Sequence, residues 1–129
     1  MINLIDWNYT FGGSTYYLSR DSGLKLMWNE ARLVCELMGA HLVKIETEED
    51  RYLQGKFGSK LTWIGATDGD EEGTFRWTDG TPLTYSNWDL GQPDDAIGED
   101  CAQYWVSGKW NDNNCGNQHY FICKEKNDV

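Results

Sequence analysis

Basic residues are scarce in this sequence, which has 11 lysines and arginines against 21 aspartates and glutamates, for a formal net charge of −10 at pH 7. Nucleic acids and anionic membrane surfaces both attract proteins through clustered Lys and Arg. The charge balance therefore argues against both of these partners. It agrees instead with a protein that binds a cation.

Long apolar runs and a charged leader are also missing. No stretch approaches the roughly 18 consecutive apolar residues of a transmembrane helix, so membrane insertion is not expected. Residues 1–6 contain no basic region and only a short apolar stretch, unlike a secretory signal peptide. We expect either that a leader has been removed and Met1 is an added start, or that this is one domain of a longer chain.

The sequence lacks the common motifs of catalysis. It contains no Gly-x-Ser-x-Gly, no Gly-x4-Gly-Lys and no His-Glu-x2-His. His41 and His119 are the only histidines, and neither has a Cys or His neighbour at zinc-ligand spacing. Counting alone leaves a glycosidase-type carboxylate pair open. However, the carboxylates concentrate where a cation would neutralise them, so we do not expect an enzyme.

No linker, low-complexity segment or internal repeat interrupts the 129 residues, and a chain of this length can bury its own core. We predict a single domain over 1–129. Seven Trp, seven Tyr and 14 Gly, with only two Pro, indicate a loop-rich domain with an aromatic core. Four cysteines without metal-type spacing indicate two disulfides and a secreted, extracellular protein, but spacing leaves all three pairings open.

The hydrophobic pattern predicts an α+β fold with two helices. Trp28, Ala31, Cys35 and Met38 form one apolar face of a helix that ends at Gly39. Residues 47–50 have the form of a capping box that begins a second helix. Short strands are predicted over the ranges 16–19, 42–45, 62–66, 75–77, 101–106 and 121–123. The range 78–98 shows no sustained period, and an irregular segment of this length in a compact domain is usually functional.

Residues 92–113 gather oxygen-bearing side chains of the kind that Ca²⁺ binds, six to eight at a time. The candidate ligands are Gln92, Asp94, Glu99, Asn111 and Asp112. Pro93 indicates a turn, and a cis bond before it would let Gln92 and Asp94 point into one cavity. The same residue types also fill ordinary solvated loops, so neither Gln92-Pro93-Asp94 nor Trp110-Asn111-Asp112 is specific alone.

In combination, the motifs closely resemble the carbohydrate-recognition domain of C-type lectins, from about residue 16 to residue 124. The resemblance rests on the order of the cysteines, of the tryptophans and of several short motifs, namely Gly39-Ala40-His41-Leu42, Trp63-Ile64-Gly65, Trp77-Thr78-Asp79-Gly80, Trp88, Gln92-Pro93-Asp94, Glu99-Asp100-Cys101 and Trp110-Asn111-Asp112. It implies the C-type lectin-like fold, with small antiparallel sheets and a long irregular calcium-binding loop region. It also implies the disulfides Cys35–Cys123 and Cys101–Cys115, without the additional N-terminal pair of longer members.

The resemblance further implies two calcium sites. The sugar-site ion would take Gln92, Asp94, Glu99, Asn111 and Asp112, with the backbone carbonyl of Asp112 as a further ligand. An auxiliary ion would take Asp68, Glu72, Asp95, Asp100 and the shared Glu99. The run 68–72 also has an ordinary interpretation as a solvated acidic loop.

The tripeptide Gln92-Pro93-Asp94 resembles that of family members that bind galactose and N-acetylgalactosamine. We therefore expect a calcium-dependent lectin that contacts the sugar through Gln92, Asp94, Glu99 and Asn111. Residues 95–98 lack the aromatic ring that often stacks on galactose, and Trp105 is the replacement candidate. The alternative is a domain of the same fold that binds a protein, ice or a mineral.

Because one shallow site binds weakly, we expect a homo-oligomer, or a tethered arrangement supplied by flanking sequence. Ile2, Leu4, Ile5 and Trp7 are candidates for its interface. The tryptophans at 28, 63, 77, 88 and 110 are expected to pack in the core, and His41 to be structural.

Overall fold

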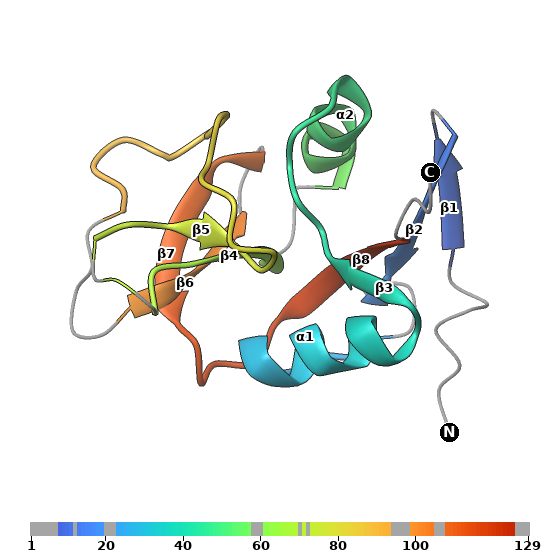
Figure 1. The fold of residues 1–129 in the computed structure, drawn as a ribbon, viewed down its shortest axis with the longest axis horizontal. Helices are drawn as coiled ribbons and strands as arrows, with labels where there is room; N and C mark the ends of the chain where they lie inside the picture. Colours follow the sequence, from blue (N-terminus) through green and yellow to red (C-terminus); the bar gives the residue numbers. More distant parts are fainter. Residues whose placement is uncertain are drawn as a thin grey trace.

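The computed structural model describes residues 8–11, 13–19, 23–57, 61–69, 71, 73–93, 99–104 and 108–125. Within these residues, two helices and eight strands follow one another (Figure 1), in the order β1 (Asn8–Phe11), β2 (Ser14–Leu18), α1 (Trp28–Leu37), β3 (Ala40–Leu42), α2 (Glu48–Phe57), β4 (Thr62–Thr67), β5 (Arg76–Trp77), β6 (Glu99–Tyr104), β7 (Trp110–Asn114) and β8 (Tyr120–Glu125). The predicted α+β class with two helices is confirmed. Among the described residues, α1 and α2 are too short and too polar to cross a membrane.

The strands form one sheet in the order β1-β2-β8-β4-β6-β7, with β3 added to β8 and β5 added to β4. The end of β8 pairs with both β2 and β3, while its start runs parallel to β4. The sheet is therefore mixed, whereas the sequence predicts only antiparallel pairing. In Figure 1, α1 lies beside β3 and β8, and α2 lies on the opposite side of these two strands. Strands β4–β7 and the long irregular segment form a separate group, which we call the second lobe.

The helix ends follow their capping chemistry. Gly39 closes α1 with φ +78°, in the left-handed region that the sequence predicts for it. At the start of α2, the Asp50 backbone N–H donates to Thr47 Oγ1 (3.1 Å), and the Thr47 N–H donates to Asp50 Oδ2 (3.0 Å). The capping box predicted over 47–50 is thus present, with an aspartate in the place where glutamate is usual.

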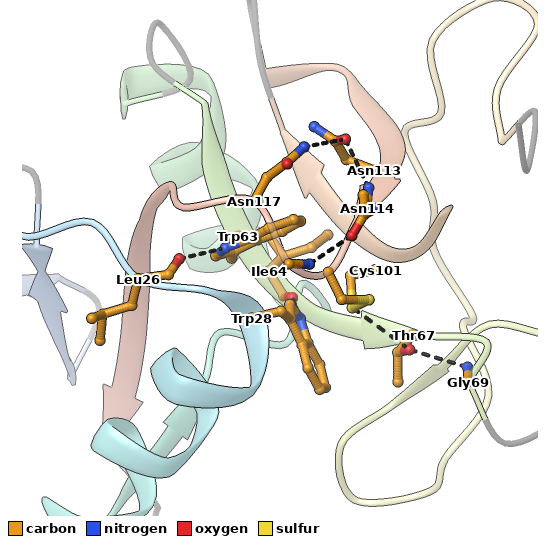
Figure 2. The surroundings of a disulfide bond; sticks show 12 residues. Leu26, Trp28, Trp63, Ile64, Thr67, Gly69, Cys101, Asn113, Asn114 and Asn117 are labelled. Carbon is orange, nitrogen blue, oxygen red and sulfur yellow. Dashed lines mark hydrogen bonds between the residues drawn. A yellow bond between two sulfur atoms is a disulfide. The ribbon is translucent and has the colours of Figure 1, made fainter. Parts of the chain in front are cut away.

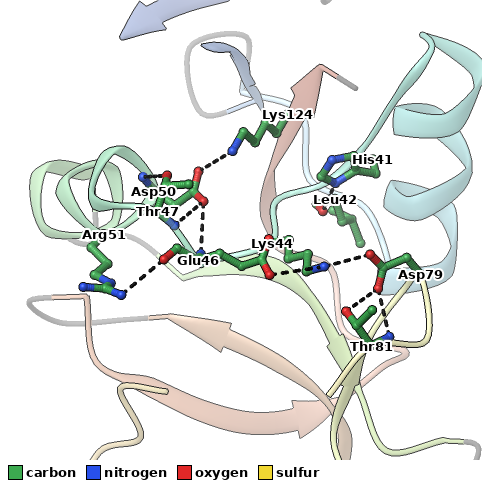
Figure 3. Close-up of polar contacts among 10 residues, drawn as sticks. All are labelled: His41, Leu42, Lys44, Glu46, Thr47, Asp50, Arg51, Asp79, Thr81 and Lys124. Atoms are coloured by element: carbon green, nitrogen blue, oxygen red, sulfur yellow. Dashed lines mark hydrogen bonds and ion pairs between the residues drawn. The ribbon is translucent and has the colours of Figure 1, made fainter. Parts of the chain in front are cut away.

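Asp50 also joins α2 to the sheet. Its carboxylate is fully buried and accepts hydrogen bonds from the Tyr16 hydroxyl (2.7 Å) and from Lys124 Nζ (2.9 Å), as Figure 3 shows for Lys124. Burial raises the pKa of Asp50, but the hydrogen bonds from Thr47, Tyr16, Glu46 and Lys124 outweigh it and hold this pKa below its ordinary value.

Two hydrophobic clusters make up the core. One is centred on Ile64, Trp110 and Tyr104, and the other packs α1 against Trp63 and Phe121. The Cys35–Cys123 disulfide lies in the second cluster, and Cys101–Cys115 closes the end of the β6–β7 hairpin; both pairings are those implied by the resemblance. Trp28, Trp63, Trp77 and Trp110 are buried, and Trp88 is half-buried against the core, which confirms their packing role.

The predicted strand over 42–45 is misplaced, because β3 covers Ala40–Leu42. At Val43 the N–H still donates to the Ile122 carbonyl (2.9 Å), but the Val43 carbonyl accepts from Gly65 N–H (2.9 Å) and so turns toward β4. Gly65 permits this approach, since a Cβ there would lie 2.8 Å from the Leu42 carbonyl oxygen. The N-terminal pairing of β1 with β2 has no counterpart among the predicted strands.

Candidate functional site

The described candidate ligands lie on three segments of the second lobe: Gln92 in the long irregular segment, Asn111 and Asp112 in β7, and Asp68 just after β4. The backbones of Glu99 and Asp100 belong to β6, but their side chains lie outside the description, as do Glu72, Asp94, Asp95 and Trp105. Within the described part, no three His, Cys, Asp or Glu side chains gather as a metal cluster. The candidate ligands whose side chains are described are two amides, Gln92 and Asn111, and two carboxylates, Asp68 and Asp112.

A short backbone relay connects Gln92 to β7. The Asp89 N–H donates to the Trp110 carbonyl (2.8 Å), and the Gln92 N–H donates to the Asp89 carbonyl (2.9 Å). The turn between them contains Gly91 at φ +80°, a conformation that L side chains rarely adopt. Trp110 is the residue before Asn111, so the relay brings the start of the Gln-Pro-Asp motif to the ligand-bearing strand. The Gln92–Pro93 bond is cis, as the sequence suggests.

The irregular segment is anchored to β7 at a second point. The Trp110 N–H donates to the Asn87 carbonyl (2.9 Å), and the Asn87 side chain donates to the Gly108 carbonyl (3.0 Å). Trp110 itself is fully buried, and three aromatic rings meet it edge to face, those of Trp77, Tyr85 and Trp88, at centroid distances of 5.9, 5.9 and 5.5 Å. Aromatic packing therefore holds the backbone from which Asn111 and Asp112 project.

Asn111 is oriented by Gln103, a residue that the sequence gives no reason to select. Gln103 lies opposite Asn111 in the β6–β7 register, is buried, and donates from Nε2 to Asn111 Oδ1 (3.1 Å). Asn111 Nδ2 donates in turn to the Asp112 carbonyl (3.3 Å). An amide oxygen has two lone pairs, so Asn111 Oδ1 can accept from Gln103 and still bind a cation.

Asp112 is 1% exposed and lies opposite Ala102. Alternation along β7 directs its side chain away from the face that carries Asn111, whereas its backbone carbonyl lies next to the Asn111 amide. The local geometry therefore places the Asp112 carbonyl, but not its carboxylate, beside Asn111, and the role of Asp112 as a calcium ligand stays a prediction.

Asp68 offers a donor for a cation within the acidic loop. The side chain is 2% exposed; its Oδ2 accepts from the Gly73 N–H (3.0 Å), and its Oδ1 is buried with no hydrogen-bond partner in the described part of the chain. A buried carboxylate oxygen without a partner is costly in an apolar setting, and a hard cation removes that cost. The donor set is all oxygen, so the described residues fit Ca²⁺.

The loop after β7 is fixed on its far side by the second disulfide. Figure 2 shows Asn113 hydrogen-bonded to the Asn114 backbone and to Asn117, close to Cys101.

The ring of His119 packs edge to face on Trp63, with ring centroids 4.9 Å apart, and its Nε2 lies 3.3 Å from Asn113 Nδ2. Burial, and next the charge of Lys25, lower the pKa of His119. Nδ1 of His41 lies 2.8 Å from the Leu42 carbonyl oxygen, in agreement with a structural role for His41.

Comparison with known proteins identifies the family to which this sequence is similar. Residues 24–125 match the model of the Lectin C-type domain. C-type lectin domain family 4 member M of Nomascus concolor is 37% identical over an alignment of 126 positions, which covers 93% of this chain and 30% of the relative. Asialoglycoprotein receptor 2 of Mus musculus is 38% identical over an alignment of 134 positions, which covers 97% of this chain and 42% of the receptor. The chain thus spans less than half the length of these curated relatives.

Solved structures agree with the fold. The mouse scavenger receptor C-type lectin carbohydrate-recognition domain superposes with a TM-score of 0.86 at 36% identity, covering 95% of this chain and 96% of that one. The trimeric Kupffer cell receptor Clec4f gives 0.82 at 35% identity, covering 98% and 87%. A calcium-independent type II antifreeze protein gives 0.80 at 29% identity, covering 92% and 91%. The lectin domains of this family are carbohydrate-binding and non-enzymatic, and this chain belongs to the C-type lectin domain family.

Proposed function

We propose that this domain is a calcium-dependent lectin that binds the vicinal hydroxyls of galactose or N-acetylgalactosamine at the ends of glycans. One observation carries the proposal: the backbone relay from Trp110 through Asp89 joins the backbone of Gln92 to the strand that bears Asn111 and Asp112. The side-chain amides of Gln92 and Asn111 are therefore proposed to belong to one site. Asp94 and Glu99 supply the carboxylates of the same proposal.

The chemistry of these donors matches a sugar diol. Calcium, when bound, supplies a positive charge to which two neighbouring hydroxyl oxygens can bind. Each hydroxyl can then donate its proton to a carboxylate, Asp94 or Glu99, and accept a hydrogen bond from an amide, Gln92 or Asn111. The hydrogen bond from Gln103 restrains rotation of the Asn111 side chain, so that the Asn111 amide is already oriented before a ligand binds. Asp68, Glu72, Asp95, Glu99 and Asp100 are proposed to hold an auxiliary ion.

The order of amide and carboxylate in the tripeptide is proposed to set the sugar preference. With Gln92 as donor and Asp94 as acceptor, the pair fits an equatorial 3-hydroxyl beside an axial 4-hydroxyl. Trp105 is proposed as the ring beneath the sugar. The asialoglycoprotein receptor among the relatives supports a glycoprotein ligand by its name. Trimeric Clec4f supports a homo-oligomer, and the disulfides support an extracellular location.

Exchange of the two tripeptide residues tests the sugar preference. The double change Gln92→Glu with Asp94→Asn keeps every calcium-binding oxygen and the net charge while it exchanges donor and acceptor. We expect galactose-resin retention to fall and mannose-resin retention to rise, with calcium affinity retained. A Trp105→Ala variant should lose galactose retention alone.

The matched control is Glu48→Gln with Gln118→Glu, which exchanges the same chemical groups at two exposed positions outside the site. It should behave as the native chain. A native domain that elutes with mannose but not with galactose, or a double variant that keeps its galactose preference, would contradict the assignment of specificity to the tripeptide.

The second candidate function is binding to ice, a mineral or a protein without sugar. Its support is the similarity to the calcium-independent antifreeze protein. If the domain is retained on a galactose resin and a chelator abolishes that retention, binding to ice, a mineral or a protein is not its sole function.

A further inference from the structure

A cavity of about 450 Å³ lies between the start of α1, the end of β4, β5 with its following turn, and the Cys101–Cys115 disulfide. In Figure 2, the ring of Trp28 extends from α1 toward the segment that carries Thr67 and Gly69, which also line this cavity. Its volume lies in the range of small-molecule sites, roughly 300–1,000 Å³. None of the described ligands of the proposed sugar site lines it. We call it the α1–β5 cavity.

The charged residues that line this cavity are positive, whereas the chain as a whole has a net negative charge. Among the described residues that line the α1–β5 cavity, Arg32 and Arg76 are the only charged ones. Arg32 Nη1 pairs with Glu36 Oε2 and Arg76 Nη2 with Glu71 Oε1, each at 2.9 Å. The two glutamate side chains are 42% and 61% exposed, and ion pairs of this kind contribute little. A guanidinium has five N–H donors, so both arginines can bind an oxyanion in addition.

The neutral walls combine hydrogen-bonding groups with aromatic rings. Asn29, Thr67, Thr74 and Thr78 contribute amide and hydroxyl groups. Trp28 and Trp77 are 5% and 2% exposed, and the Trp28 N–H is engaged by the Ile64 carbonyl at 2.9 Å, which fixes its ring. The hydroxyl and amide groups can bind the hydroxyls of a sugar, while the two buried tryptophans close the apolar side of the cavity.

We infer that the α1–β5 cavity binds an acidic sugar, one that carries a carboxylate or a sulfate ester, through Arg32 and Arg76. The threonines and Asn29 contact its hydroxyls, and the tryptophans line the apolar side. This second site is separate from the calcium-dependent site of the proposed function, and it extends recognition from a neutral terminal sugar to an anionic one. Binding here does not displace galactose.

The test is a titration of the ¹⁵N-labelled domain in saturating calcium and galactose, followed by NMR. The probes are methyl β-glucuronide, glucose 6-sulfate, neutral methyl β-glucoside and inorganic sulfate. We expect the two acidic sugars to shift the Trp28 indole and Arg32 resonances with dissociation constants on the order of millimolar, as suits a shallow saccharide site. The neutral sugar and inorganic sulfate should bind more weakly. The carboxylate and sulfate probes show which anion is preferred.

Arg32→Gln with Arg76→Gln should weaken binding of the acidic sugars by roughly tenfold or more, since two charge-assisted contacts are lost. The matched control, Arg51→Gln with Lys25→Gln, removes two positive charges that do not line the cavity and should leave binding intact. Three results would overturn the inference: equal binding of the control and arginine variants, inorganic sulfate as tight as the sulfated sugar, or shifts confined to Gln92, Asn111 and Asp112. A native domain that binds the acidic sugars at this cavity but does not bind galactose would instead count against the proposed function.

Discussion

Gln103 is a buried residue that orients Asn111, a candidate calcium ligand, although Gln103 is not itself a candidate ligand. It holds Asn111 Oδ1 at 3.1 Å, while its own Oε1 is buried with no hydrogen-bond partner in the described part of the chain. An unpaired buried oxygen costs stability, so a role in orienting Asn111 explains a residue that packing alone does not.

Gln103→Leu tests this positioning role. Removal of an outer partner of a metal ligand typically lowers metal affinity by about tenfold or more, so calcium affinity should fall by that order. The calcium-free domain should keep its stability, because the unpaired oxygen is removed together with the donor. Calcium titration by calorimetry and urea unfolding in chelator measure the two quantities. Gln118→Leu at an exposed position is the control, and unchanged calcium affinity in Gln103→Leu would refute the positioning role.

At the scale of elements, one ion pair ties α2 to β8. Asp50 is buried and Lys124 is 11% exposed, whereas the comparable Lys44–Asp79 pair in Figure 3 has an aspartate that is 53% exposed. Asp50→Asn leaves Lys124 facing a neutral buried partner and should lower the free energy of unfolding by about 3 kcal/mol. Asp79→Asn, the control, should lower it by less than about 1 kcal/mol. Equal losses in urea unfolding would contradict this ranking.

The same pair sets an acid limit on stability. The folded-state pKa of Asp50 lies below its unfolded value, so its contribution is present above about pH 4 and is lost as the pH falls through the folded-state pKa. Stability of the native domain should therefore decrease below about pH 4, and Asp50→Asn should flatten that decrease.

The loop region between Asp68 and Asp112 should respond to calcium as a unit. The proposed function assigns the carboxylates of both ion sites to this region, and without the cations these like charges would repel one another. We expect a chelator to accelerate hydrogen exchange there, while α1 and β8 keep their protection. Exchange rates that do not change with chelator would contradict a structural ion in this region.

At the scale of the whole molecule, weak single sites call for multiple copies. A shallow sugar site binds on the order of millimolar, and several linked copies raise the effective affinity. We expect analytical ultracentrifugation to detect a homo-oligomer at high concentration. The candidate interface residues Ile2, Leu4, Ile5 and Trp7 lie outside the described residues. A strictly monomeric chain would contradict the oligomer without affecting the lectin proposal.

Local patterns in the sequence were sufficient for the fold class, the helix ends and the core tryptophans, because caps and periodic apolar residues act over a few positions. The disulfide pairing required the family resemblance. The parallel contact of β4 with β8 and the early end of β3 depend on residues far apart in the chain, as at Gly65 and Val43. Gln103 could be found only once the β6–β7 register placed it opposite Asn111.

The Cys35–Cys123 disulfide joins residues 88 positions apart, so most of the chain lies inside a covalent ring. Leu90, almost fully exposed beside the proposed sugar site, lies within that ring. A protease that cuts the backbone there opens the ring but releases no fragment, and the two pieces migrate together on a gel until a reductant separates them. Cleavage damage at the binding loop would therefore escape electrophoresis of the unreduced protein.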